Sequence, residues 1–227
     1  MFKKPRKESY EYIEVELNPN SPVSNAIEKF VINLELVNID KLYKVIQVTS
    51  TLPTEGKTTI VGNLAYVLAQ KGYRTLIIDL DLRKPKINRI FNHANVSGIN
   101  RYLLEKVDEE ELIVKTDKGI DFIPTGPQRG SVTSVLESKK LSDLIESLKE
   151  KYDYIILDTP PMQVNADALI TSKLADGLLY ILGNNIVKKS LIKESIDTLK
   201  RRNINILGIV LTQVKIPKRE HYYYYND

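Results

Sequence analysis

The residues best suited to chemistry begin in the segment Thr51–Thr58, which reads TLPTEGKT. A lysine and a threonine directly after a glycine are typical of a loop that holds nucleotide phosphates. Lys57 would place its charge on the β- and γ-phosphates, and the Thr58 hydroxyl would coordinate Mg²⁺. Thr51 stands where a glycine is usual in this pattern. The predicted ATP-binding residues are Thr54, Glu55, Gly56, Lys57, Thr58 and Thr59.

Aspartates supply the other half of the expected site. Asp158 ends the apolar segment YIILD, where an acid can orient Mg²⁺ directly or through a water molecule. Asp79 and Asp81 stand two residues apart, so their carboxylates project to the same side of an extended segment. One acid near the metal and one near an incoming hydroxyl would suit phosphoryl transfer. Arg83 and Lys84 follow, and they either balance this charge or form a solvated basic turn.

These residues need a scaffold, and the hydrophobic pattern predicts a parallel sheet. Uniformly apolar segments alternate with segments whose apolar residues recur at helical spacing, as in sheets covered on both faces. Expected strands cover 43–49, 75–79, 121–124, 154–158, 177–182 and 206–211, and expected helices cover 24–37, 57–71, 131–138, 140–150, 166–174 and 188–202. The predicted fold class is α/β, a P-loop NTPase with a mostly parallel central sheet and helices on both faces. Ligands bind beyond the carboxyl ends of such strands, where the loop and the acids would meet.

Composition fits one domain with two tails. The chain has 227 residues, of which 42% are hydrophobic and 27% charged, as in ordinary globular proteins. We expect an N-terminal arm over 1–23, a P-loop domain over 24–214 and a flexible tyrosine-rich tail over 215–227. The net charge of +4 is too small to indicate a nucleic-acid partner, and the lack of cysteine excludes thiolate chemistry. No apolar run approaches the roughly 20 residues that span a bilayer, so we expect a cytoplasmic protein.

The aromatic residues are unusual, because the chain has 13 tyrosines and no tryptophan. Four tyrosines are consecutive near the C-terminus, where they would expose a large aromatic surface without a packing role. We predict that they accept phosphate; the alternative is a basic, disordered end. Tyr10 and Tyr12 are weaker candidates. The predicted phosphoacceptors are Tyr222, Tyr223, Tyr224 and Tyr225.

Taken together, these segments resemble the bacterial tyrosine kinases that regulate capsule and exopolysaccharide synthesis, a branch of the Mrp, MinD and ParA-like P-loop ATPases. The similarity extends over residues 21–211. It is carried by VTSTLPTEGKTT at 48–59, LIIDLDLRKP at 76–85 and YIILDTPP at 154–161. The ending HYYYYND is similar to the tyrosine cluster that these kinases phosphorylate on one another.

The resemblance implies a protein-tyrosine kinase that uses ATP and Mg²⁺ and autophosphorylates its tail. It implies catalytic roles for Lys57, Asp79, Asp81 and Asp158, and metal ligation by Thr58, Asp81 and Asp158. Asp79 is then the first candidate for accepting the tyrosine proton. It also implies a partner, a transmembrane activator of the polysaccharide co-polymerase type, which would recruit the kinase to the inner face of the cell membrane.

The chain departs from the family pattern at three places. Thr54 stands where the family loop usually has glycine, and Thr212 where an asparagine often lies near the adenine. Val31 and Leu34 replace the arginines of the family's Glu-x-x-Arg-x-x-Arg motif, which is linked to ring assembly. We therefore expect self-association for trans-phosphorylation without a large ring.

Two other functions remain open for these motifs. A ParA- or MinD-like ATPase switch usually carries an extra lysine five residues before Lys57, where this chain has Leu52. A nucleotide-binding scaffold with weak activity would also tolerate the altered loop and the missing arginines.

Overall fold

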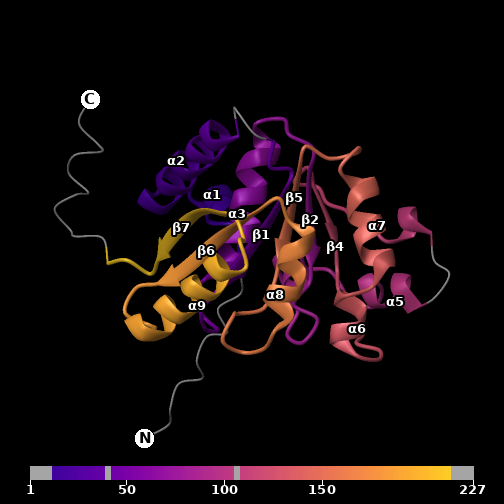
Figure 1. The fold of residues 1–227 in the computed structure, drawn as a ribbon. Helices are drawn as coiled ribbons and strands as arrows, with labels where there is room; N and C mark the ends of the chain where they lie inside the picture. The colour runs from indigo at the N-terminus through magenta and orange to yellow at the C-terminus, as the bar shows by residue number, and fades with distance from the viewer. Residues whose placement is uncertain (1–11, 39–41, 105–107, 216–227) are drawn as a thin grey trace, which may run out of the picture.

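A sheet of seven strands lies between two layers of helices in the computed structural model, which describes residues 12–38, 42–104 and 108–215 (Figure 1). The strand order is β3-β4-β2-β5-β1-β6-β7, and every neighbouring pair is parallel except β3 with β4. This confirms the predicted α/β class with a mostly parallel sheet. The strands are β1 (Val45–Ser50), β2 (Thr75–Asp79), β3 (Val114–Lys115), β4 (Ile120–Ile123), β5 (Tyr154–Asp158), β6 (Gly177–Gly183) and β7 (Ile206–Thr212).

Alternating side chains along the strands divide the core between the two faces of the sheet. Ile77 of β2 packs in one cluster, whereas its neighbours Leu76 and Ile78 pack in the other. The first face is covered by α1 (Glu14–Leu17), α2 (Pro22–Val37), α3 (Lys57–Gln70) and α4 (Ile87–Ile90). The second is covered by α5 (Ile99–Leu104), α6 (Val132–Leu136), α7 (Lys139–Leu148), α8 (Asp167–Thr171) and α9 (Lys189–Arg201), with the 3₁₀ turns η1 (Glu109–Glu111) and η2 (Ser172–Leu174) in its connections.

Helix α2 packs its apolar stripe on its own domain, as the spacing of its apolar residues indicates. Ser21 caps the helix by accepting a hydrogen bond from the Ser24 amide, and a proline follows at the first helical position. Val31 and Leu34 are 0% and 3% exposed in the core cluster that includes α3. The two positions that carry arginine in the resembling family are therefore interior positions here.

The described part of the expected N-terminal arm is partly folded. Helix α1 lies within it, and Ile13 and Val15 are 2% and 7% exposed. The Val15 amide also donates to Asn63 Oδ1 of α3 at 3.0 Å. An arm without packed structure is therefore a wrong expectation for the described part of this stretch, because an apolar pair two residues apart anchors a helix too short to show periodicity. Residues 1–11 and the tail from 216, with its four tyrosines, lie outside the described residues.

Three connections meet at the carboxyl edge of the sheet, as the strand pattern predicts. Asp79 and Asp158 are register partners at the ends of β2 and β5, and the loop after β1 leads into α3 beside them.

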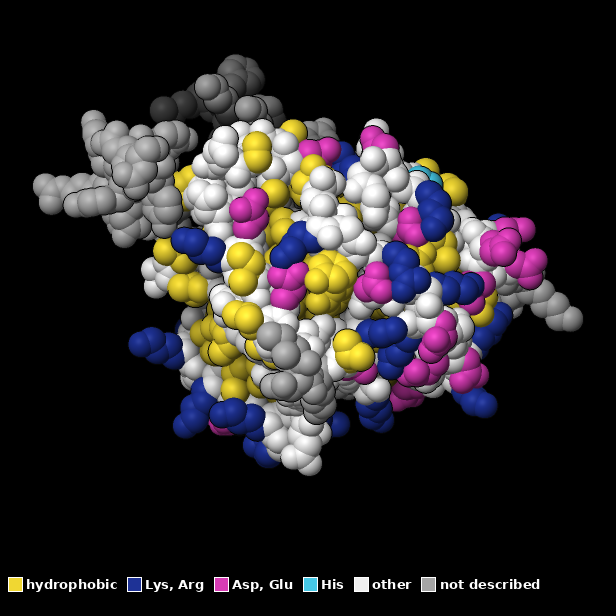
Figure 2. Space-filling model, turned by 90° about the horizontal axis from the view of Figure 1, so that it is seen from above, with side chains coloured by type: hydrophobic (Ala, Val, Ile, Leu, Met, Phe, Trp, Pro, Cys, Tyr) yellow, Lys and Arg dark blue, Asp and Glu magenta, His cyan; other side chains and the backbone are white. Residues whose placement is uncertain are grey.

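No helix in the described ranges has the length and apolar character needed to cross a bilayer. On the face seen in Figure 2, basic and acidic side chains are interspersed, in keeping with the small net charge.

The packing of α2 predicts unequal effects for two identical substitutions. Leu34→Ala should lower the free energy of unfolding by about 2–5 kcal/mol, because it leaves a cavity in the core. Leu36→Ala on the same helix should change it by less than about 0.5 kcal/mol, because Leu36 is 59% exposed. Urea unfolding of both variants measures the difference, and equal losses would contradict this packing.

Candidate nucleotide and phosphoryl-transfer site

The loop between β1 and α3 has the backbone geometry of a phosphate loop. Gly56 and Thr54 both adopt left-handed conformations, with φ of +85° and +69°. This conformation costs a residue with a Cβ roughly 1–2 kcal/mol, which explains why a glycine suits the position of Thr54. The Thr54 carbonyl accepts a hydrogen bond from Gln213 Nε2 at 2.7 Å, which helps to hold the strained residue in place.

Glu55 fastens this loop to the ends of β6 and β7. Its carboxylate is 1% exposed and accepts hydrogen bonds from the amides of Leu52 at 2.6 Å and Gly183 at 2.8 Å. Thr212 Oγ1 donates to the Glu55 carbonyl at 2.6 Å. The side chain of Glu55, predicted among the ATP-binding residues, thus binds protein backbone, and only its own amide remains for a phosphate. Thr212, at the end of β7, likewise stabilises the loop through its hydrogen bond to the Glu55 carbonyl.

Lys57, Thr58 and Asp158 form the buried centre of the site. The Lys57 ammonium donates to Asp158 Oδ1, and Thr58 Oγ1 donates to Asp158 Oδ2 at 3.0 Å. Burial lowers the pKa of Lys57, but the negative charges of Asp158, Asp81 and Asp79 outweigh that effect, so its pKa is raised overall. Lys57 therefore carries the fixed positive charge that phosphate binding requires.

Asp79 and Asp81 lie in the same place but in different surroundings. Asp79 is 1% exposed and accepts hydrogen bonds from the amides of Asp81 (3.1 Å), Lys86 (3.1 Å) and Ile87 (3.2 Å). Burial, reinforced by the charge of Asp158, raises the pKa of Asp79 to about 8. Asp81 is 9% exposed, and burial raises its pKa as well. Of the pair, Asp81 lines the open cleft and Asp79 shapes the turn after β2.

A cleft of about 430 Å³ opens over this centre. Basic residues after β2 line one side of it, but Arg83 is engaged by Asp167, with Nε to Oδ2 at 2.7 Å. Arg83 thus ties the turn after β2 to α8, a role that its neighbours in sequence do not reveal. The predicted site residues in its lining are Thr54, Gly56, Lys57, Thr58, Thr59 and Asp81.

The oxygen donors of this cleft fit Mg²⁺ carried in with a nucleotide. Thr58 and Asp158 offer hard oxygen ligands side by side, and Mg²⁺ is usually held by one or two carboxylates together with phosphates and water. Among the described residues, no group of three or more acidic, histidine or cysteine side chains forms a ready-made metal cage. The site therefore suits a metal bound jointly by protein and phosphate.

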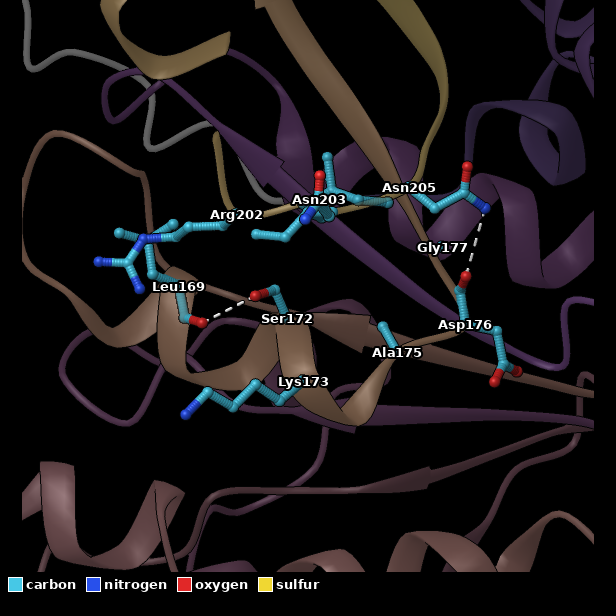
Figure 3. A pocket seen from close by; sticks show the side chains of 11 residues that line it. Leu169, Ser172, Lys173, Ala175, Asp176, Gly177, Arg202, Asn203 and Asn205 are labelled. Carbon is cyan, nitrogen blue, oxygen red and sulfur yellow. Dashed lines mark hydrogen bonds between the residues drawn. The ribbon is translucent and has the colours of Figure 1, made fainter. Parts of the chain in front are cut away.

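A second cleft of about 420 Å³ lies at the opposite edge of the sheet, beside the start of β6 (Figure 3). Lys173 after α8 and Arg202 after α9 line it, together with Asn203 and Asn205. Asp176 at this edge accepts hydrogen bonds from the amides of Lys44 and Val45 and thereby supports β1. The lining of this cleft contains no residue of the loop over 51–58, which lies at the carboxyl edge instead.

The buried acid at the end of β2 predicts a pH-dependent stability without metal or nucleotide. The pKa of Asp79 is higher in the folded state than in the unfolded one, so folding is favoured at low pH and loses this contribution as the pH rises. The free energy of unfolding should be lower at about pH 9 than at about pH 6, and Asp79→Asn should largely remove this difference. Asp143→Asn on the exposed side of α7 is the control, and its free energy of unfolding should depend on pH as in the native chain. An identical slope in Asp79→Asn would contradict this assignment.

Comparison with known proteins shows which proteins this chain is similar to. A family model described as an AAA domain matches residues 43–175. The chain is 33% identical over 194 residues to tyrosine-protein kinase YwqD of Bacillus subtilis strain 168, covering 85% of this chain and 82% of that protein. The crystal structure of the chimerical protein CapA2B2 matches with a TM-score of 0.86 and 30% identity, covering 90% of each chain.

A more distant structure shares the fold alone. The septum site-determining protein MinD of Pyrococcus horikoshii, complexed with Mg-ADP, matches with a TM-score of 0.65 and 23% identity. The match covers 80% of this chain and 76% of MinD. The phosphate loop and all three aspartates of the site lie inside the region that the family model matches. On these similarities, the chain belongs to the family of bacterial tyrosine-protein kinases within the P-loop ATPases.

Proposed function

We propose that this chain is an ATP- and Mg²⁺-dependent protein-tyrosine kinase that autophosphorylates its C-terminal tyrosines and regulates capsular or exopolysaccharide synthesis and export. The observation that carries the proposal is the buried contact of Asp158 with both Lys57 and Thr58, two residues that line a cleft together with Asp81. This arrangement offers a phosphate countercharge, metal ligands and a further acid within one cleft.

Each residue then has a defined part in the transfer. Lys57 would bind the β- and γ-phosphates and stabilise the charge on the transferring group. Mg²⁺ bound to Thr58, Asp158 and the phosphates would neutralise charge as the bond to ADP breaks. Asp81 lines the cleft, whereas both oxygens of Asp79 accept backbone hydrogen bonds. We therefore propose that Asp81 accepts the proton of the incoming tyrosine and that Asp79 has a positioning role. This differs from the family resemblance, which favours Asp79 as the proton acceptor.

The proposal includes a transmembrane activator that recruits the kinase to the inner face of the cell membrane. This part of the proposal is based on the family resemblance. It also includes self-association in which one chain phosphorylates another. The burial of Val31 and Leu34 supports small assemblies over a large ring, because these positions face the interior of the same domain.

Substitution of the phosphate-binding lysine should abolish the reaction. Lys57→Met should reduce phosphotyrosine formation by roughly 100-fold or more while the fold is retained, because the main countercharge is lost. Lys173→Met is the matched control, since Lys173 is exposed and lies at the opposite edge of the sheet. ATP turnover and phosphotyrosine should be measured together on both variants.

Two outcomes of that experiment would contradict the proposal. Nearly unchanged phosphotyrosine in Lys57→Met would exclude the proposed site. ATP hydrolysis by the native chain without phosphotyrosine, even with the membrane activator present, would favour a ParA- or MinD-like switch. Little turnover of either kind would favour a nucleotide-binding scaffold.

The tail should be phosphorylated by a neighbouring molecule. The described chain reaches Lys215, two residues beyond Gln213 in the cleft lining, and about ten further residues span roughly 35 Å when extended. A Lys57→Met chain with the native tail should be mixed with an active chain in which Tyr222, Tyr223, Tyr224 and Tyr225 are changed to phenylalanine. Phosphate on the tail of the inactive chain, measured by peptide mass spectrometry, is the expected result. Tail labelling confined to active native chains at every concentration would contradict transfer in trans.

A further inference from the structure

Tyr12 lines the cleft that holds Lys57, Thr58 and Asp81, although no sequence motif includes it. It is 50% exposed, so its side chain is open to the cleft and to solvent. Of the tyrosines within residues 12–38, 42–104 and 108–215, it alone contributes to this lining. The kinase site therefore has a tyrosine of its own chain at its mouth.

The residues after Tyr12 hold it at this position. Ile13 is 2% exposed and packs near Gly62 of α3, the helix that begins with Lys57. The Val15 amide donates to Asn63 Oδ1 of the same helix at 3.0 Å. Because Ile13 and Val15 are fixed to the helix that carries the phosphate-binding lysine, Tyr12 is anchored next to the reacting centre.

The charges around Tyr12 also favour an acceptor segment. Lys84 and Lys86 line the same cleft as Tyr12. Arg83 also lines it and is held there by its ion pair with Asp167. The sequence over 8–14 reads ESYEYIE, which is acidic on both sides of Tyr12. An acidic sequence around an acceptor tyrosine is electrostatically complementary to a basic rim.

We propose that Tyr12 is a phosphoacceptor modified by the active site of its own chain. The inference rests on the kinase function proposed above and differs from the transfer between chains proposed for the tail. The phenolic oxygen of Tyr12 forms a bond to the γ-phosphorus of ATP, while the bond from that phosphorus to the bridging oxygen breaks and ADP leaves with the electron pair. The phenolic proton passes to the Asp81 carboxylate and from there to solvent.

The product should remain at the cleft. A phosphate on Tyr12 adds about −1.5 to −2 charges next to Lys84 and Lys86, which are suited to charge-assisted hydrogen bonds with it. One phosphate per chain is expected at this position. Because the acceptor and the active site belong to one molecule, the rate should follow first-order kinetics in protein.

The test uses the full-length chain with Tyr222, Tyr223, Tyr224 and Tyr225 changed to phenylalanine, which removes the tail acceptors. After incubation with Mg-ATP, mass spectrometry of the N-terminal peptide should show phosphate on Tyr12, with a first-order rate constant unchanged by tenfold dilution. Tyr12→Phe should lose it, whereas Tyr10→Phe and the control Tyr66→Phe should keep it. Tyr66 is a partly buried tyrosine of α3 outside the cleft lining.

An isotope-labelled Lys57→Met chain, mixed with the active chain, separates the two routes. It should stay unphosphorylated on Tyr12 while the active chain is modified. Phosphate on Tyr12 of the inactive chain, a rate constant that falls on dilution, or phosphate on Tyr10 instead would overturn the inference. A native chain that labels its tail but never Tyr12 would overturn this inference alone. A native chain with no phosphotyrosine at all, even with the membrane activator, would overturn the proposed function and this inference together.

Discussion

The buried contact between the Lys57 ammonium and the Asp158 carboxylate sets the charge balance at the carboxyl edge of the sheet. Removing one partner of such a pair leaves an uncompensated charge and typically costs about 3–5 kcal/mol. Asp79 and Asp81 add two more carboxylates to the same ammonium, so the acids outnumber the cation. Burial and the charge of Asp158 raise the pKa of Asp79 to about 8 within this excess of negative charge. A divalent cation bound with a nucleotide would neutralise it, which is why this centre is suited to Mg-ATP.

The loop that carries Lys57 is held in place from a distance. Glu55 reaches the amide of Gly183 at the end of β6, and Thr212 at the end of β7 reaches the carbonyl of Glu55. The left-handed Thr54 is held by Gln213 in the same way. Such fixed geometry lets the loop amides face phosphate without rearrangement, which is how positioning contributes to transfer. The strands beyond β1 therefore shape the site as well as the core.

Patterns local in sequence predicted much of this arrangement. The phosphate loop, the acids after β2 and β5 and the parallel sheet all follow from short motifs and apolar segments. The meeting of Lys57 with Asp158 follows from the rule that ligands bind at the carboxyl ends of parallel strands. The partners of Glu55 and Arg83 could not be predicted, because hydrogen bonds between residues 84 to 128 positions apart have no local signature. The position of Tyr12 was missed because α1 has only 4 residues and shows no helical period.

The most direct measurement of the central claim is the intact mass of the full-length chain after incubation with ATP and Mg²⁺. If the centre around Lys57 and Asp158 transfers phosphate to tyrosine, the mass should rise in steps of one phosphate, and only when both ATP and Mg²⁺ are present. Phosphatase specific for phosphotyrosine should reverse the increase. An unchanged mass under these conditions, with the membrane activator also present, would contradict the account.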